Sequence, residues 1–197
     1  MKSSTTAAGE FDYVIVGAGS AGCVLANRLT ENPKISVCLL EAGGADSNPL
    51  VHMPFGVAIG TYLPRSDANW HFETVPQVHL NGRKGYQPRG RMLGGSSSIN
   101  AMIYIRGARR DYDRWAEMGA AGWSYADVLP YFRKSQDQSR GADRHHAVGG
   151  PLSVSDLRYK NPLSTAFLDA AAELQLPPND DFNGDRQEGV GFYQVTQ

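Results

Sequence analysis

The stretch from Asp12 to Glu41 constrains the fold more than any other part of the chain. Tyr13–Val16 is a β-branched and aromatic run, which is typical of a strand, and 23–29 carries apolar residues at helical spacing. Three glycines separate the predicted strand from the predicted helix, and a second strand is predicted from Ile35 to Glu41. The pattern therefore predicts an α/β unit of the Rossmann type, in the order strand, turn, helix, strand.

Each of the three glycines has its own expected role. Gly17 suits the tight turn, Gly19 lets the backbone approach a pyrophosphate, and Gly22 lets the helix pack closely on the strand. Free N–H groups at the helix N-terminus attract phosphate. Glu41 is placed to accept hydrogen bonds from an adenosine ribose, and its charge disfavours a bound 2′-phosphate. The stretch predicts a dinucleotide site, with a purely structural glycine turn as the alternative, and it does not distinguish NAD from FAD.

Composition narrows the class of protein. The 197 residues carry a formal net charge of −1, which gives no reason to expect nucleic acid or an anionic membrane as a partner. The 22 glycines and 11 prolines predict many turns and few long helices. Cys23 and Cys38 lie in apolar runs, where a thiol usually serves as a small core residue, so no disulfide framework is expected. No stretch has the length of a membrane span, and the small polar residues of 1–10 predict a disordered tail.

The middle of the chain predicts an extended excursion followed by a hairpin. Residues 42–63 are interrupted by glycine and proline, which disfavours a regular helix. Residues 69–75 alternate in the manner of a strand, and Asn81-Gly82 is a strong turn signal before 84–87. Trp70 in this hairpin is either a core residue or a cofactor contact.

A glycine- and serine-rich loop follows the hairpin. Gly94 and Gly95 precede three serines, so the loop offers backbone N–H groups and hydroxyls to a polar ligand. Arg91 adds a positive charge that suits phosphate. A plain surface linker is the alternative. It is disfavoured because the loop leads into the apolar segment Ile99–Ile105, which we expect to be buried.

The same region resembles a known family. Gly-Arg-x-Leu-Gly-Gly-Ser-Ser-x-Ile-Asn from Gly90, followed by Tyr104, Gly107 and Asp113, is similar to the first signature of the glucose–methanol–choline (GMC) oxidoreductases, which depend on FAD. Together with the N-terminal fingerprint, the resemblance covers most of the chain. Within the family, the chain resembles bacterial alcohol and choline dehydrogenases, in particular those that act on medium-chain primary alcohols.

The resemblance implies a fold and a domain organisation. The expected fold is a Rossmann-like FAD-binding domain, related to that of p-hydroxybenzoate hydroxylase, followed by the start of an α+β substrate domain. We expect a disordered tail at 1–10, the FAD-binding domain at 11–150 and an incomplete substrate domain at 151–197, with a hinge at 139–151. In this last part, 162–174 predicts an amphipathic helix, and 191–196 a strand without its neighbours.

The resemblance also implies which residues bind FAD. They are Gly17, Gly19, Ser20, Ala21 and Gly22 at the pyrophosphate, Glu41 and Ala42 at the adenosine, Trp70 against the cofactor, Arg91, Leu93, Gly94, Gly95 and Ser96 along it, and Asn100, Ala101, Met102 and Ile103 beside the isoalloxazine ring. Family members with covalently attached flavin carry a histidine immediately before the equivalent of Asn100. Ile99 stands there in this chain, so non-covalent FAD is expected.

No catalytic residue is expected in the chain. In the family, a histidine takes the hydroxyl proton beside a second His or Asn, and both lie near the C-terminus of a longer chain, beyond the equivalent of Gln197. His52, His71 and His79 are scattered. The adjacent pair His145-His146 lies among residues typical of a turn, which predicts that both side chains are solvated. Metal binding by the pair is disfavoured, because no third ligand lies at a typical spacing. Asn179–Arg186 lacks the calcium-loop pattern, which favours a plain loop.

Three functions remain open at this point. The first is the FAD-binding portion of an oxidoreductase that converts primary alcohols, medium-chain or aromatic, to aldehydes. The second is a non-catalytic flavin-binding or interaction fragment, and the third is an NAD-dependent dehydrogenase, which would have no use for the 94–100 signature. Expected partners are the alcohol and the C-terminal part of the enzyme as a second chain, without nucleic acid or an integral membrane segment. The expected location is cytoplasmic or peripheral to the inner membrane.

Overall fold

The computed structural model describes residues 9–53, 55–56 and 67–197. The chain divides into two compact units, Met1–Ala101 and Met102–Gln197. Most of the predicted tail at 1–10, and part of the predicted excursion at 42–63, fall outside the described residues. The domain limits expected from the sequence stay a prediction.

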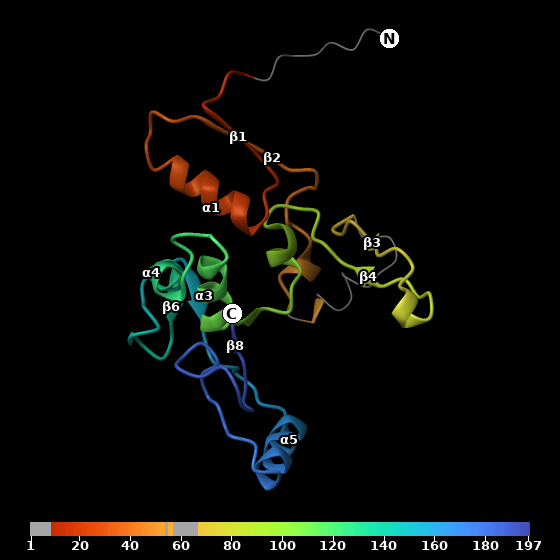
Figure 1. Cartoon of the computed structure of the whole chain (residues 1–197). Helices are drawn as coiled ribbons and strands as arrows, with labels where there is room; N and C mark the ends of the chain where they lie inside the picture. Colours follow the sequence, from red (N-terminus) through yellow and green to blue (C-terminus); the bar gives the residue numbers. More distant parts are fainter. Residues whose placement is uncertain (1–8, 54, 57–66) are drawn as a thin grey trace. The chain divides into compact units, whose positions relative to one another are not determined.

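The first unit begins with the predicted strand–helix–strand arrangement. Its elements are β1 (Tyr13–Val16), α1 (Ser20–Leu29), β2 (Val37–Leu40), the 3-10 helix η1 (Pro49–Val51), β3 (Phe72–Glu73), the 3-10 helix η2 (Val78–Leu80), β4 (Tyr86–Gln87) and the 3-10 helix η3 (Gly95–Ser98). β1 and β2 pair in parallel, from Tyr13 opposite Val37 to Val16 opposite Leu40. A parallel pair requires a crossover, which α1 provides, and Figure 1 shows α1 alongside the two strands.

The predicted hairpin is also confirmed. β3 and β4 pair antiparallel, with Phe72 opposite Gln87 and Glu73 opposite Tyr86. Asn81 and Gly82 both have positive φ angles, +55° and +73°, which residues of these types tolerate best. These two residues turn the chain directly after η2, within the connection 74–85 that joins the two strands.

Burial of the first unit differs from the sequence expectation. Cys23 is exposed and Cys38 is only half-buried, so neither thiol is the core residue that its apolar neighbours suggested. Val14 and Val16 of β1 are 59% and 84% exposed. The reason is that β1 and β2 form a sheet of two strands, whose apolar side chains are incompletely covered by the described residues.

The second unit contains a small set of paired strands and three helices. Its elements are β5 (Ile103–Tyr104), α3 (Arg109–Glu117), α4 (Tyr125–Ser135), β6 (Gln136–Gln138), β7 (Leu152–Val154), α5 (Pro162–Glu173) and β8 (Gln194–Val195). β6 pairs with β7 in parallel, and β5 pairs with β8 antiparallel. Ser155 and Val195 exchange two backbone hydrogen bonds of 2.9 Å. The expectation that the final strand lacks neighbours is therefore wrong.

Ile103 and Ile105 also depart from expectation, because they are 50% and 46% exposed rather than buried.

The predicted helix at 162–174 is confirmed as α5. The helix begins after Asn161, and the Asn161 side chain accepts a hydrogen bond from the Leu163 N–H. Its apolar Leu163 and Phe167 are 80% and 69% exposed. In the described part of the chain, no helix is long and apolar enough to cross a membrane.

Candidate functional site

The turn between β1 and α1 depends on two glycines. Gly17 has a φ of +96°, a conformation that L-residues with side chains rarely adopt, and its N–H donates to Leu40 O at 2.7 Å. A Cβ added to Gly22 would lie 1.9 Å from Gly17 O and 3.4 Å from the Ile15 side chain. The absence of a side chain at position 22 thus lets α1 approach the strand closely.

The N-terminus of α1 is open to a ligand. Gly19 is the N-cap residue in an extended conformation, and no side chain caps the helix. The first backbone N–H groups of a helix have no intrahelical acceptor, and they carry the positive end of the helix dipole. A Cβ on Gly19 would meet nothing within 4 Å. This end of α1 therefore combines free donors with space, which is the geometry that binds phosphate groups.

Glu41 ties the end of β2 to this turn. Its carboxylate accepts hydrogen bonds from the Ala18 N–H at 2.8 Å and the Gly43 N–H at 2.9 Å. The Gly43 N–H first, then the Ala18 N–H, lower the pKa of the Glu41 carboxyl below its ordinary value, with a smaller contribution from the charge of Arg91. The side chain is thus held ionised and oriented beside the turn, with lone pairs left for further donors.

A second glycine-rich segment lies against the first. The Gly94 N–H donates to Ala18 O at 2.7 Å, and the Leu93 N–H donates to Gly44 O at 3.0 Å. Isolated bridges join Gly19 with Gly94 and Gly44 with Met92. The structure thus brings together two motifs that are far apart in the sequence, and together they form one continuous backbone surface.

The serine hydroxyls of this loop are engaged within it. Ser97 Oγ donates to Gly94 O at 2.6 Å, Ser98 Oγ donates to Leu93 O at 2.9 Å, and Ser96 Oγ accepts from the Gly90 N–H at 3.1 Å. These three hydrogen bonds hold the loop in its conformation. The expectation that the hydroxyls of the loop meet a polar ligand stays a prediction.

Arg91 and Trp70 lie side by side in the first unit. The Arg91 guanidinium carbon is 5.1 Å from the centroid of the Trp70 ring, within the range of a cation–π contact. Arg91 Nε is buried and has no hydrogen-bond partner among the described residues. Sequence reasoning proposed both residues separately, but nothing in the sequence indicated that they contact each other.

The remaining predicted residues are placed as follows. Ser20 and Ala21 begin α1, Ala42 follows Glu41, and Asn100 and Ala101 end the first unit. Met102 and Ile103 belong to the second unit. The assignment of all these residues to a cofactor stays a prediction.

The expectation for His145 and His146 is wrong. Both are buried, 5% and 3% exposed, rather than solvated. His145 Nε2 lies 3.0 Å from Asp185 Oδ1, and His146 Nε2 lies 2.9 Å from Asp181 Oδ2. The error arises because each acidic partner is 35 or more positions away, so local composition carries no sign of the pairing.

The histidine pair is part of a polar cluster that sequence reasoning missed. Arg106, 5% exposed, donates from Nη1 to His145 O at 2.9 Å and from Nη2 to Gln136 Oε1 at 2.5 Å. Asn183 Oδ1 accepts from the Arg106 N–H at 2.7 Å. A buried charge is unfavourable unless its donors have hydrogen-bond acceptors. These bonds therefore connect Arg106 to β6, to the loop of His145 and to the loop of Asn183.

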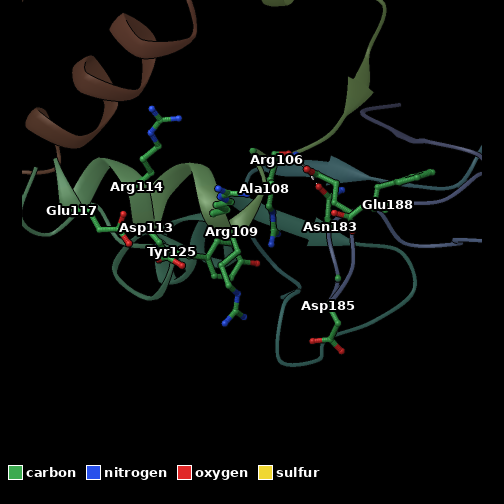
Figure 2. Close-up of a pocket in the computed structure, with 15 residues that line it drawn as sticks. Arg106, Ala108, Arg109, Asp113, Arg114, Glu117, Tyr125, Asn183, Asp185 and Glu188 are labelled. Carbon is green, nitrogen blue, oxygen red and sulfur yellow. Dashed lines mark hydrogen bonds between the residues drawn. The ribbon is translucent and has the colours of Figure 1, made fainter.

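A pocket of about 630 Å³ lies beside this cluster. Its walls come from the segment 106–108, from α3 along its length, from Tyr125 at the start of α4 and from the loop at 182–188 (Figure 2). The Arg109 guanidinium lies over the Tyr125 ring at 4.7 Å from its centroid. The lining mixes arginines with Asp113, Glu117 and Glu188, so its charge favours no single class of ligand.

Within the described residues, no group of three or more His, Cys, Asp or Glu side chains is arranged to hold a metal ion.

Comparison with known proteins identifies the family. The model of the GMC oxidoreductases, N-terminal region, matches residues 11–197. The chain belongs to the GMC oxidoreductase family. The family depends on FAD, and the α/β fold and the family resemblance inferred from the sequence are thereby confirmed.

Among curated GMC proteins, the chain is 53% identical over 188 residues to an alcohol dehydrogenase (acceptor) of Pseudomonas putida, covering 95% of this chain and 34% of that protein. It is 50% identical over 194 residues to the mitochondrial choline dehydrogenase of Homo sapiens, covering 95% of this chain and 32% of that protein. The chain thus spans about a third of the length of the curated relatives it matches.

A solved GMC-type structure shows the same fold. Pyridoxine 4-oxidase from Mesorbium loti superposes with a TM-score of 0.89 at 36% identity, covering 95% of this chain and 37% of that one. This agreement extends the family assignment from sequence to three-dimensional structure.

Proposed function

We propose that this chain is the FAD-binding part of an oxidoreductase that oxidises primary alcohols to aldehydes. The observation that carries the proposal is the meeting of the two glycine-rich segments at the open N-terminus of α1, with the ionised Glu41 beside them. The alcohol and choline dehydrogenases among the relatives support the class of substrate. Medium-chain or aromatic primary alcohols are the substrates we favour.

The residues present fit the cofactor. The open side of Gly19 and the N-terminus of α1 would receive the pyrophosphate, and Glu41 has lone pairs left for the ribose hydroxyls. The buried, unpartnered Arg91 Nε is a donor suited to a phosphate oxygen. An NAD site would use the same turn, but it would leave the second glycine-rich segment without a role.

The chemistry divides between cofactor and protein. When bound, FAD would supply the acceptor for the hydride that leaves the carbinol carbon. In this chain, we assign backbone N–H groups within 100–103 to oppose the negative charge that develops beside the ring, because fixed donors stabilise such charge without reorganisation. The base that takes the hydroxyl proton is proposed to lie outside these 197 residues, in a C-terminal part that acts with this one.

We also propose that the cofactor is held without a covalent bond. Ile99 has no nucleophilic atom at the position that the resemblance assigns to the attachment histidine. Flavin should therefore pass into the supernatant when the FAD-loaded protein is precipitated with acid.

A flavin-binding fragment without activity of its own is the second candidate. The exposed apolar side chains of β1 and α5 favour it, since apolar surface of this kind commonly marks an interaction site. Both candidates would bind FAD, but the fragment would not oxidise an alcohol.

The experiment that separates the two candidates is an anaerobic titration. The FAD-loaded chain is mixed with a medium-chain primary alcohol such as 1-octanol, and the visible flavin band is followed. Loss of the band, with formation of octanal, is expected when the catalytic part is present. A band that stays oxidised in the presence of that part, for octanol and for benzyl alcohol, would contradict the alcohol oxidation proposal and favour the fragment.

A further inference from the structure

Trp70 and Arg91 are held by one backbone frame. The Trp70 N–H donates to Arg89 O at 2.9 Å, and the Arg91 N–H donates to Ala68 O at 2.8 Å, on either side of the bridge between Asn69 and Gly90. The backbone positions from which the Trp70 and Arg91 side chains extend are therefore fixed relative to each other. The frame holds the backbones of the two residues on neighbouring segments, within reach of the 5.1 Å contact between guanidinium and ring.

Two neighbouring groups act on the Arg91 guanidinium, the face of the Trp70 ring and the negative charge of Glu41. A tryptophan ring is the best aromatic partner for a cation, and the planar guanidinium stacks on it while its edge keeps its donors. The charge of Arg91 also acts on the Glu41 carboxylate, which places Arg91 near the residue expected at the adenosine ribose. Arg91 Nε is buried without a hydrogen-bond partner in the described part of the chain, which is unfavourable unless an acceptor comes to it.

We propose that Trp70 is a positioning residue, which holds the Arg91 guanidinium toward the diphosphate of FAD rather than packing against the isoalloxazine ring. This inference rests on the proposed function, namely that the first unit binds FAD. Its physical basis is preorganisation: an arginine already stacked on a ring loses less freedom when it binds phosphate.

The test is a double-mutant cycle on the full chain, with FAD and ADP as separate probes. ADP carries the adenosine and the diphosphate but no flavin, so its affinity reports on the part of the site that includes Arg91 and not on contacts with the flavin ring. Trp70→Leu should weaken the binding of FAD and of ADP by the same factor, roughly threefold to thirtyfold. Trp70→Phe, which keeps an aromatic face, should recover most of this loss. In an Arg91→Met background, Trp70→Leu should cause no further loss.

Two controls accompany the cycle. Trp123→Leu removes another half-exposed tryptophan, 53% exposed and in the second unit, and should leave both affinities unchanged. Urea unfolding of each variant checks its fold. If Trp70→Leu does not fold, the cycle is run with Trp70→Phe, for which a smaller but equal loss for FAD and ADP is expected.

Three outcomes would overturn the inference. A loss for FAD with unchanged ADP binding would place Trp70 against the flavin. Additive losses in the double variant, or no loss in either Trp70 variant, would show that Trp70 does not act through Arg91. In these cases the wild-type chain still binds FAD. A wild-type chain that binds neither FAD nor ADP would instead overturn the proposed function, and the inference with it.

Discussion

Gly19 and Gly22 lie three positions apart and have opposite surroundings. A side chain on Gly22 would collide with the backbone at Gly17, whereas a side chain on Gly19 would point into open space. Position 19 therefore leaves open space, where we propose that the ligand binds, whereas the fold requires glycine at position 22. This difference separates an effect on binding from an effect on stability.

We expect Gly19→Val to fold with near wild-type stability and to bind FAD roughly tenfold to a hundredfold more weakly, because its side chain occupies the phosphate position. Gly22→Val should fail to fold or lose much of its stability. Fluorescence titration with FAD and urea unfolding measure the two effects. Gly9→Val, whose Cβ would make only ordinary contact with Phe11, is the matched control. Wild-type affinity in Gly19→Val would remove Gly19 from the site.

At the level of single residues, the sequence predicted the turn glycines and the acidic residue, Glu41, at the end of the second strand, which the structure places directly after β2. These follow from local rules, since a turn after a strand and before a helix has few solutions. The contact between Arg91 and Trp70, and the bonds that hold the Glu41 carboxylate, could not be predicted. They depend on how separate segments meet in space.

The loops at 143–146 and 181–185 contact each other through paired histidine and aspartate side chains, which the sequence did not predict. His145 is surrounded by Asp143, Arg144, His146, Asp185 and the Tyr125 hydroxyl, which lies 3.5 Å from its Nδ1, with Asp181 acting on it electrostatically. Burial, and then the charge of Arg144, lower the pKa of the His145 imidazole below its ordinary value. In the neighbouring contact between His146 and Asp181, burial would raise the pKa of the Asp181 carboxyl, but hydrogen bonds from His146 and the Asn183 N–H bring it below its ordinary value.

This arrangement predicts a loss of stability in acid. For His145, the folded-state pKa lies below the unfolded value, so its contribution is present above about pH 6.5 and declines as the pH falls below that value. Asp181 adds a further loss below about pH 4, since its folded pKa is also lowered. One such proton changes the free energy of unfolding by at most about 1.4 kcal/mol per pH unit.

We expect His145→Gln to show a shallower decline in the free energy of unfolding between about pH 6.5 and 5 than the wild type. Urea unfolding at several pH values measures the decline. His79→Gln, which changes an exposed histidine of η2 in the first unit, should follow the wild-type profile. Parallel profiles for His145→Gln and the wild type would show that His145 does not contribute to acid sensitivity.

For the whole molecule, the pattern of local elements was predictable and the pattern of burial was not. Strand β1, the hairpin and α5 follow from periodicity and turn residues, and the structure has each of them. Sequence reasoning assumed that apolar runs are buried, yet Val16, Ile103 and Phe167 are all at least half exposed. Burial depends on which layers cover an element, and the chain spans only about a third of the length of its relatives.

The central claim is that this chain holds FAD through the backbone surface at Gly17–Gly22 and 91–95. The most direct test is a titration of the purified full chain with FAD, followed by the shift of the visible flavin band, with ADP and riboflavin as competitors. We predict saturable binding of FAD, competition by ADP, and little competition by riboflavin, because we assign the backbone donors at the start of α1 and the Arg91 guanidinium to the diphosphate, which riboflavin lacks. Saturable binding of NAD without binding of FAD, or competition by riboflavin but not by ADP, would contradict the account.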